Sequence, residues 1–308
     1  MGIQAAPQDL GTILFSDGFP DHVLLDSGDG RKLERYGRIV VDRPEPQAMW
    51  ARRLPPEVWN RADAVFEPSA GDGEGGKWTL RGKVPEKWPM AHEGLRFFGR
   101  LTPFRHLGVF PDQKPHWDFL SSALARCRTA DGGPPQVLNL FAYTGVASLV
   151  AAKAGARVTH VDASKKALEW AKENQAESGL PPDGIRWILD DATKFVAREA
   201  RRGRKYHGIL LDPPKYGRGP KGEIWDLFES LPGMVRQCAE ILADDASFMI
   251  LTAYAVRASY LSLDQLMREA LAGRGGRLVS GELAIRAPDS GLAVPTSLYS
   301  RWSADATA

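Results

Sequence analysis

The chain has 308 residues, of which 43% are hydrophobic, so it is long enough for about two domains and a substantial core. Its 40 Lys and Arg residues nearly balance 38 Asp and Glu residues, which excludes a uniformly basic protein that coats nucleic acid. Two cysteines are too few for a disulfide scaffold or a cysteine-based zinc site. Apolar runs too short for a membrane helix, and an amino terminus without the basic flank of an export signal, predict a cytoplasmic protein.

The first hundred residues predict a small β-rich domain. Pro, Gly and Trp are frequent there, and short apolar runs alternate with turn residues. One hairpin is explicit, with a strand at residues 22–25, turn residues 27–30, and a returning strand that ends at residues 39–41. We place the domain boundary between residues 105 and 106, and a role of residues 1–105 in substrate recognition is a hypothesis.

Residues 106–308 predict a Rossmann-like α/β domain. From about residue 116, apolar runs of four to six residues alternate with helical patterns, which is typical of a doubly wound, mostly parallel sheet. A helix over residues 164–178 has Ser164 as its cap and Gly179 as its stop. The seven expected strands are residues 136–140, 157–161, 185–189, 207–211, 247–252, 278–285 and 296–302.

The first of these strands leads into a helix through the loop Phe141-Ala142-Tyr143-Thr144-Gly145. Such a turn exposes backbone N–H groups and the positive end of a helix, which suits an anion or a ligand carboxylate. Any α/β domain needs tight turns between strands and helices, so the loop alone fits a structural role equally well.

Acidic residues stand at the next two strand ends. Asp162 can accept hydrogen bonds from the two hydroxyls of a ribose, although it is also a plausible helix-start residue. The pair Asp190-Asp191, followed by Ala192, can bind an adenine amine or can simply cap a helix. A dinucleotide site would need the glycines of G-x-G-x-x-G, and FAYTGVAS supplies one, which disfavours nicotinamide and flavin cofactors.

The most specific motif is Asp212-Pro213-Pro214-Lys215-Tyr216, after the fourth strand. Tandem prolines fix two backbone φ angles and remove two N–H donors, so the segment forms a rigid wall of acceptors aimed at an amino group or ring nitrogen. The aromatic ring offers a face for stacking a planar base. A purely structural turn is the alternative for the Pro-Pro dipeptide alone.

These motifs together resemble the class I S-adenosylmethionine-dependent methyltransferases. With GVFPDQKPHW ahead of them, the chain is similar to the bacterial family that contains the large-subunit ribosomal RNA methyltransferase I. The resemblance covers roughly residues 105 to 260. It implies a seven-stranded class I fold, S-adenosylmethionine as cofactor, and an RNA-binding enzyme that acts in ribosomal RNA processing.

The resemblance also implies a role for individual residues. The backbone of the 141–145 loop would follow the methionine part of the cofactor, Asp162 would hold its ribose, and Asp212 with the Pro213 carbonyl would lie near the transferred methyl. The acceptor site would comprise Asp212, Pro213, Pro214 and Tyr216. The full cofactor set would be Phe110, Gln113, Asn139, Phe141, Ala142, Tyr143, Thr144, Gly145, Asp162, Ala163, Ser164, Asp191, Ala192 and Asp212, with His116 as a further candidate.

Relatives that methylate carbon-5 of cytosine need a thiolate in or just after the Asp-Pro-Pro motif. Here those segments contain no cysteine, and Cys127 and Cys238 both have helical core patterns around them. We therefore expect transfer to a base nitrogen, without metal or covalent intermediate. Scattered histidines agree with the absence of a metal site.

Basic residues near the motifs are consistent with an RNA substrate. For those at positions 198–205, a solvated helix face is an equally good alternative. The sequence leaves open methyl transfer to a protein side chain or small molecule, and a non-catalytic nucleoside-binding module. The basic residues form three groups: Arg198, Arg201, Arg202, Arg204 and Lys205; Lys215, Arg218 and Lys221; and Arg31, Lys32, Arg35 and Arg38.

Overall fold

The computed structural model describes residues 10–69, 75–254 and 256–305. The chain divides into two compact units. The larger unit contains described residues up to 14, residues 115–283, and residues from 296 onward, and the smaller unit contains residues 15–114 and 284–295. The chain therefore crosses between the units four times, and the predicted boundary at residue 105 lies within the smaller unit.

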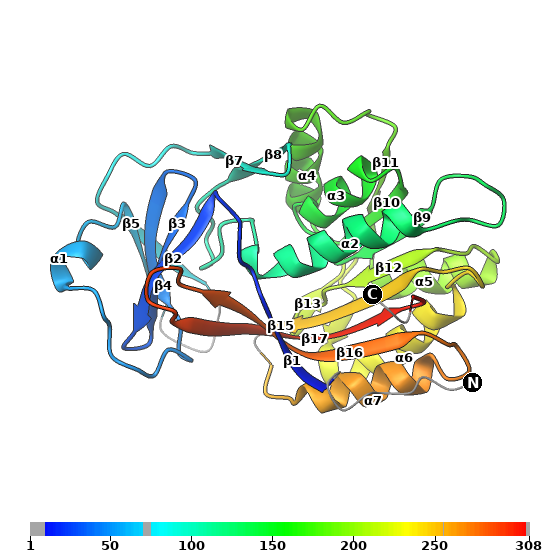
Figure 1. The fold of residues 1–308 in the computed structure, drawn as a ribbon. Coiled ribbons are helices and arrows are strands. Elements are labelled where there is room, and N and C mark those ends of the chain that lie inside the picture. The colour runs from blue at the N-terminus through cyan, green and yellow to red at the C-terminus, as the bar shows by residue number, and fades with distance from the viewer. Residues whose placement is uncertain (1–9, 70–74, 255, 306–308) are drawn as a thin grey trace. The chain divides into compact units, whose positions relative to one another are not determined.

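The larger unit is built on one sheet of eight strands (Figure 1). Their order is β1-β16-β17-β15-β12-β9-β10-β11. The strands are β1 (Leu10–Phe15), β9 (Gln136–Leu140), β10 (Arg157–Asp162), β11 (Ile185–Leu189), β12 (Gly208–Leu211), β15 (Phe248–Tyr254), β16 (Arg277–Arg286) and β17 (Ala293–Ser303).

The middle of this sheet is parallel. Strand β9 pairs in parallel with β10 and β12, and β12 pairs in parallel with β15, whereas β17 runs antiparallel to β15. All residues of β12 are buried, as expected for a central parallel strand covered on both faces. The predicted fold class and all seven predicted strands are confirmed.

The sequence did not predict the eighth strand. Strand β1 has no buried residue, and it lies at the sheet edge beside β16. There a Cβ atom on Gly281 would lie 2.0 Å from the Thr12 carbonyl oxygen, so the two backbones approach closely. Because its side chains are at most partly buried, this strand has no clear apolar alternation that sequence analysis could detect.

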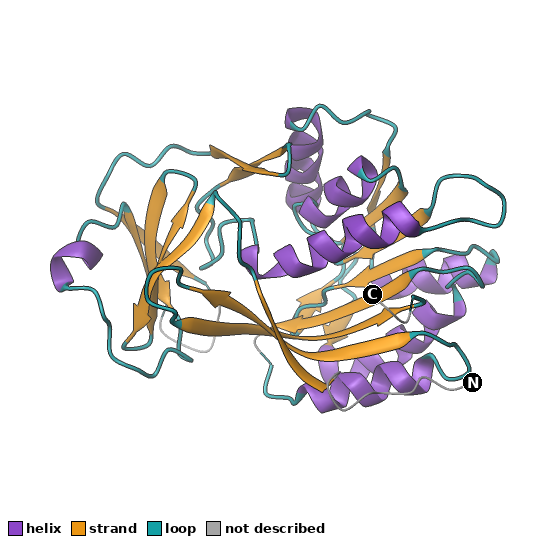
Figure 2. Ribbon diagram, viewed as in Figure 1, coloured by secondary structure: helices purple, strands orange, loops and turns teal. Residues whose placement is uncertain are grey.

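Helices cover both faces of the sheet, as Figure 2 shows, with α2, α3 and α4 on one side and α5, α6 and α7 on the other (labelled in Figure 1). The helices are α2 (Lys114–Arg126), α3 (Val146–Lys153), α4 (Lys165–Glu177), α5 (Ala192–Arg201), α6 (Leu227–Glu240) and α7 (Tyr260–Ala270). The Ser164 hydroxyl accepts a hydrogen bond from the Ala167 N–H at 3.2 Å, which confirms the predicted start of α4. Throughout the part of the chain that the structure describes, every helix is too short or too polar to cross a bilayer.

The smaller unit contains a five-stranded sheet, β2-β3-β4-β5-β6, and the separate pair β7-β8. The predicted hairpin is confirmed, with Asp29 and Gly30 at φ 51° and 72° in its turn. Its returning strand is in fact two strands, because Gly37 at φ 58° makes a second turn. The elements are β2 (His22–Gly28), β3 (Arg31–Tyr36), β4 (Ile39–Pro44), α1 (Pro56–Trp59), β5 (Ala64–Pro68), β6 (Gly76–Leu80), β7 (Trp88–His92), β8 (Leu95–Gly99) and a 3-10 helix at Pro111–Gln113.

A buried charge cluster fixes the hairpin of the smaller unit. Glu34, which has no exposed surface, accepts a hydrogen bond from Arg43 Nε at 2.6 Å, and His22 Nε2 lies 3.0 Å from its other oxygen. The ammonium of Lys32 lies 3.2 Å from Glu45, and Arg31 Nε donates to Asp42 at 2.5 Å. Arg31 and Lys32, which the sequence offered as phosphate contacts, are thus engaged inside the smaller unit.

Candidate active site

The predicted motifs of the larger unit lie along one edge of its sheet. Strands β9, β10, β11 and β12 are parallel neighbours, so the loops after their carboxyl ends share that edge. Two hydrogen bonds join the loops: the Tyr143 N–H donates to Asp162 Oδ2 at 2.8 Å, and the Asp190 N–H donates to the Asp162 carbonyl at 3.2 Å. Three consecutive β-α connections therefore meet at one edge of the sheet, the edge where ligands commonly bind in open α/β sheets.

The loop between β9 and α3 has an unusual backbone. Phe141, Tyr143 and Gly145 adopt positive φ angles of 54°, 48° and 83°, a conformation that costs non-glycine residues free energy. Gly145 is the N-cap of α3, and among the described residues no side chain caps this helix. The first N–H groups of α3 therefore offer donors and a positive helix end to an anion.

Gly145 is also required by the space around it. A Cβ atom on it would lie 3.1 Å from the Ala171 Cβ and 3.3 Å from the His160 Cε1. Both the positive φ and this close packing exclude larger residues, so glycine allows the start of α3 to pack closely against β10 and α4.

A buried polar network supports the loop from below. The Asn139 side-chain amide donates to Ser148 Oγ at 2.9 Å, and that hydroxyl shares a hydrogen bond with His160 Nδ1 at 3.0 Å. Burial lowers the pKa of His160 to about 3, so its ring is neutral at physiological pH. Asn139 is itself 4% exposed, which makes its side chain a support for α3 and β10.

Asp162 links the loop to the start of α4. Its Oδ2 accepts from the Tyr143 N–H and its Oδ1 accepts from the Ser164 N–H, both at 2.8 Å. Burial raises the pKa of this carboxyl, while the two N–H groups act in the opposite direction. A carboxylate has about four acceptor positions, so two hydrogen bonds leave it the capacity to hold a pair of hydroxyl donors.

The next strand end serves as a helix cap. Asp191 is the N-cap of α5 and accepts from the Lys194 N–H at 2.9 Å, which is the structural alternative that the sequence left open. Asp190 accepts from the Asp191 N–H at 2.9 Å and forms an ion pair with Arg198. Ala192 begins α5 and is 5% exposed. An adenine contact by Asp191 and Ala192 stays a prediction.

The Asp-Pro-Pro segment is held on both sides. Asp212 Oδ1 accepts from the Thr252 hydroxyl at 2.8 Å, at the end of the neighbouring strand β15. Pro213 is buried and Pro214 is exposed, and the Pro214 carbonyl accepts from the Trp225 indole at 2.7 Å. The segment is thus a rigid wall, as the tandem prolines predict.

A hairpin that the sequence did not predict follows this wall. Strands β13 (Tyr216–Arg218) and β14 (Ile224–Asp226) pair antiparallel, with Gly217 opposite Trp225. The buried Trp225 ring also lies 4.8 Å from the Phe141 ring, centroid to centroid. Trp225 therefore connects the 141–145 loop with the Asp-Pro-Pro wall.

Trp225 and Thr252 are site residues that sequence reasoning missed. The one signal for Trp225 was its place just before Asp226, the N-cap of α6, in the apolar run of Ile224, Leu227 and Phe228. Thr252 gave no signal, because its hydrogen bond depends on the pairing of β12 with β15.

Neither thiol lies at this edge. Cys238 is fully buried in the core, as predicted, and burial raises its pKa. Cys127 is partly exposed, so its predicted place in the core is wrong. It shares a pocket with Asp245 and Ser247, just before the amino end of β15, where burial and the Asp245 charge raise its pKa. Both sulfurs are therefore protonated thiols at neutral pH.

The predicted cofactor contacts Phe110 and Gln113 belong to the smaller unit, whereas the motifs lie in the larger one. The roles of these two residues therefore stay predictions. The Phe110 carbonyl accepts from the Gln113 N–H at 3.1 Å across the 3-10 helix. His116 lies in the larger unit and is 1% exposed, with its ring 5.3 Å from that of Tyr299. This histidine fills the space between α2 and β17.

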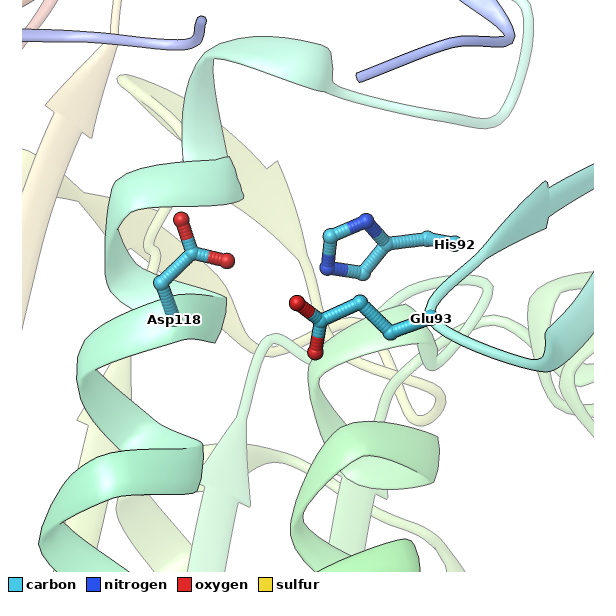
Figure 3. A group of neighbouring side chains, drawn as sticks. All are labelled: His92, Glu93 and Asp118. Atoms are coloured by element: carbon cyan, nitrogen blue, oxygen red, sulfur yellow. The ribbon is translucent and has the colours of Figure 1, made fainter. Parts of the chain in front are cut away.

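Figure 3 shows His92 and Glu93 with Asp118, residue types that can bind metal ions. His92 ends β7 and Glu93 follows it in the smaller unit, whereas Asp118 lies on α2 in the larger unit. Since the three residues come from two different units, we assign them no metal-binding role. The His92 ring packs against Phe19, 5.5 Å away, as an ordinary core histidine does.

Comparisons with known proteins agree with this geometry. The profile of a family described as Conserved hypothetical protein 95 matches residues 106–243. The chain is 27% identical to the ribosomal RNA large subunit methyltransferase I of Alteromonas mediterranea over 205 residues, which are 65% of this chain and 49% of that protein. The chain thus spans about half the length of this curated relative.

Solved structures match over more of the chain. The crystal structure of SMU.776 complexed with SAH has a TM-score of 0.68 at 17% identity, covering 92% of this chain and 75% of that one, which supports the fold. The crystal structure of the SAM-dependent methyltransferase from Agrobacterium tumefaciens has a TM-score of 0.92 and 50% identity, covering 99% of this chain and 97% of that one. Because half of the residues agree over nearly the whole length, the predicted family is confirmed, and the chain belongs to the S-adenosylmethionine-dependent methyltransferases.

Proposed function

We propose that the protein binds S-adenosylmethionine at the carboxyl edge of its sheet and transfers the methyl group to a base nitrogen of ribosomal RNA. The observation that carries this proposal is the meeting of three features at one edge. They are the uncapped start of α3, the Asp162 carboxylate, and the Asp212-Pro213-Pro214 wall. A ribosomal RNA methyltransferase among the relatives supports the substrate class.

The residues at this edge fit the parts of the cofactor. The amino end of α3 suits the methionine carboxylate, and Asp162 suits the ribose hydroxyls. Phe141 and Tyr143, at positive φ, shape the loop between the two, and the Tyr143 N–H holds the Asp162 carboxylate in place. Bound S-adenosylmethionine supplies an electrophilic methyl on its sulfonium, so the protein has mainly to position an acceptor.

Asp212 and the Pro213 carbonyl are the acceptor groups that we assign to the base. Asp212 is oriented by Thr252, and Trp225 fixes the adjoining Pro214 carbonyl, so neither acceptor needs to reorganise during transfer. In the reaction, the nitrogen lone pair would bond to the methyl carbon while the electron pair of the breaking carbon–sulfur bond leaves with S-adenosylhomocysteine. The nitrogen would then be positive, and its proton would leave through the hydrogen bond to Asp212, so that a neutral methylated base remains.

Transfer to nitrogen is supported by the state of the two cysteines. Addition to carbon-6 of a pyrimidine needs a thiolate beside the base. Cys238 is buried in the core, and Cys127 lies before the amino end of β15, at the opposite edge from Asp212. Direct transfer to a nitrogen needs no such nucleophile.

One face of the β13-β14 hairpin supports a nucleic-acid acceptor. Tyr216, Arg218 and Ile224 alternate outward, opposite the buried Trp225, and Tyr216 and Ile224 are 54% and 67% exposed. Phe228, at the start of α6, is 57% exposed. Exposed apolar side chains gathered beside cationic ones are suited to stacking on bases while contacting phosphates.

The experiment has two steps. Calorimetric titration with S-adenosylmethionine should give micromolar binding, and incubation with methyl-labelled cofactor and unmodified ribosomal RNA should then label a nitrogen of a base. Labelling of a protein or small amine, with none on RNA, would replace RNA by that acceptor. No binding of cofactor would overturn the proposal. The same proposal includes a cytoplasmic location and a role for residues 1–105 in choosing the RNA.

A further inference from the structure

At the amino ends of the strands, opposite the candidate active site, the sheet of the larger unit borders a basic pocket of about 410 Å³. It lies in the larger unit, at the amino ends of the central strands and beneath the connection from α5 to β12. Its lining residues include four cations, Arg157, Arg186, Arg204 and Lys205, and two acids, Asp183 and Glu199.

The acid at the floor of the pocket is already engaged. Glu199 is 1% exposed, accepts a hydrogen bond from the Tyr206 hydroxyl at 2.8 Å, and pairs with Arg202 at 3.1 Å. The Lys205 ammonium donates to the Glu240 carbonyl at 2.6 Å. Glu199 and Lys205 are therefore engaged within the protein, and the three arginines supply most of the positive charge that the pocket offers to a ligand.

The three arginines of the pocket are exposed, and the one remaining acid of its lining, Asp183, forms no ion pair with them among the described residues. Within the described ranges, the guanidinium groups of Arg157, Arg186 and Arg204 have no ion pair. Arg157 begins β10, and Arg186 lies on β11 opposite Thr159, so two of the groups project from a rigid sheet. Exposed guanidinium groups bordering one cavity form a site for a multiply charged anion, and their planar forks match phosphate oxygens.

We propose that this pocket binds backbone phosphates of the RNA substrate. The inference rests on the proposed function and extends it to a surface remote from the acceptor base. The five residues of β9 span about 16 Å between the two edges, a short distance for a folded RNA. Phosphates at the amino edge would thus hold an RNA whose target base lies at the carboxyl edge.

The test compares a triple variant, Arg157→Gln, Arg186→Gln and Arg204→Gln, with a matched control, Lys153→Gln, Lys172→Gln and Arg236→Gln. The control removes the same charge from exposed positions on α3, α4 and α6. Binding of unmodified ribosomal RNA transcripts is measured from low to high salt. The pocket variant should bind at least about tenfold more weakly at low salt, and its salt slope should fall by about two, since three phosphate contacts are lost.

Cofactor titration of each variant checks that the carboxyl edge is intact. If the triple variant misfolds, RNA binding is measured on the single charge-reversal variant Arg204→Glu, which should also bind RNA more weakly. If the pocket and control variants lose RNA affinity equally, or if neither loses any, the pocket is not a phosphate site. Either result would leave the proposed methylation of RNA unaffected. If the unaltered protein binds no RNA, the proposed substrate fails and this inference fails with it.

Discussion

The two edges of the central sheet contain opposite chemistry on the same strands. At the carboxyl ends of β9, β10 and β12, backbone N–H groups and carboxylates hold one another, as in the pair of hydrogen bonds at Asp162. At the amino ends, Arg157 and Arg186 border a pocket and form no ion pair among the residues described. One edge is ordered before a ligand arrives, whereas the other attracts a ligand through charge alone.

We therefore expect the carboxyl edge to determine the specificity of binding and the amino edge to contribute mainly to its affinity. Groups that are fixed by hydrogen bonds can discriminate one ligand from another, because they do not reorganise on binding. Exposed guanidinium groups mainly raise affinity and association rate for any polyanion, and salt screens them. Substitutions at the carboxyl edge should therefore change turnover or cofactor binding at every salt concentration, while those at the amino edge should matter most at low salt.

The largest effect is expected for Asp212→Asn. The amide keeps the size of the side chain but removes the negative charge that we propose to lie beside the methylated nitrogen, so turnover should fall by about 10² to 10³. Single-turnover transfer of labelled methyl to ribosomal RNA measures this loss, and cofactor titration provides the control. A variant with unchanged turnover would remove Asp212 from the chemistry.

The next effect is expected for Asp162→Ala, which removes the acceptors that we propose for the ribose and releases the Tyr143 N–H. Hydrogen bonds to a charged group contribute about 1.5–3 kcal/mol each, so the cofactor should bind at least about tenfold more weakly. Calorimetry measures the dissociation constant. Unaltered affinity would show that the ribose lies elsewhere.

The same carboxyl predicts a pH dependence. Burial raises its pKa, so it takes up a proton at higher pH than an ordinary aspartate does. The protonated form loses an acceptor, so cofactor affinity should decline on acidification, beginning at a higher pH than an ordinary aspartate would give. Asp162→Ala should lack this decline in titrations across the same pH range, and a decline of equal size in the variant would assign it to another group.

The sequence predicted the parts of this site whose signals are local. The loop at 141–145, Asp162 and the Asp-Pro-Pro segment each follow a buried strand, and parallel pairing then brings them to one edge. The missed residues depend on contacts between distant segments. Trp225 meets Phe141 and Pro214 only because the β13-β14 hairpin folds back.

Charge was the least predictable property of the fold. Lys32 and Arg31 looked available for phosphate, yet they pair with Glu45 and Asp42 across neighbouring strands. Arg157 and Arg186 drew no attention in the sequence, since they lie far apart in it, and the pairing of β10 with β11 brings them into one pocket. The partner of a charged side chain is set by strand register, which local patterns do not fix.

A smaller effect is expected for Gly145→Ala, with Gly155→Ala as its control. Both glycines have φ near 85°, so each alanine should cost about 1–2 kcal/mol of folding free energy. Only at Gly145 would the new Cβ meet neighbours, because no described atom lies within 4 Å at Gly155. Chemical unfolding should show the larger loss at Gly145, and cofactor affinity should fall there alone. Equal behaviour of the two variants would mean that close packing at Gly145 has no role in the site.

The smallest effect is expected for Trp225→Phe. Phenylalanine keeps an aromatic ring beside Phe141 but cannot donate to the Pro214 carbonyl, and a net hydrogen bond contributes about 0.5–1.5 kcal/mol. Turnover should fall several-fold while cofactor affinity is retained, because the loss acts on the wall rather than on Asp162. Trp225→Ala, which also removes the ring, should weaken cofactor binding as well, since Phe141 loses its support. If both variants reduce turnover alone, Trp225 positions the acceptor wall without connecting it to the cofactor loop.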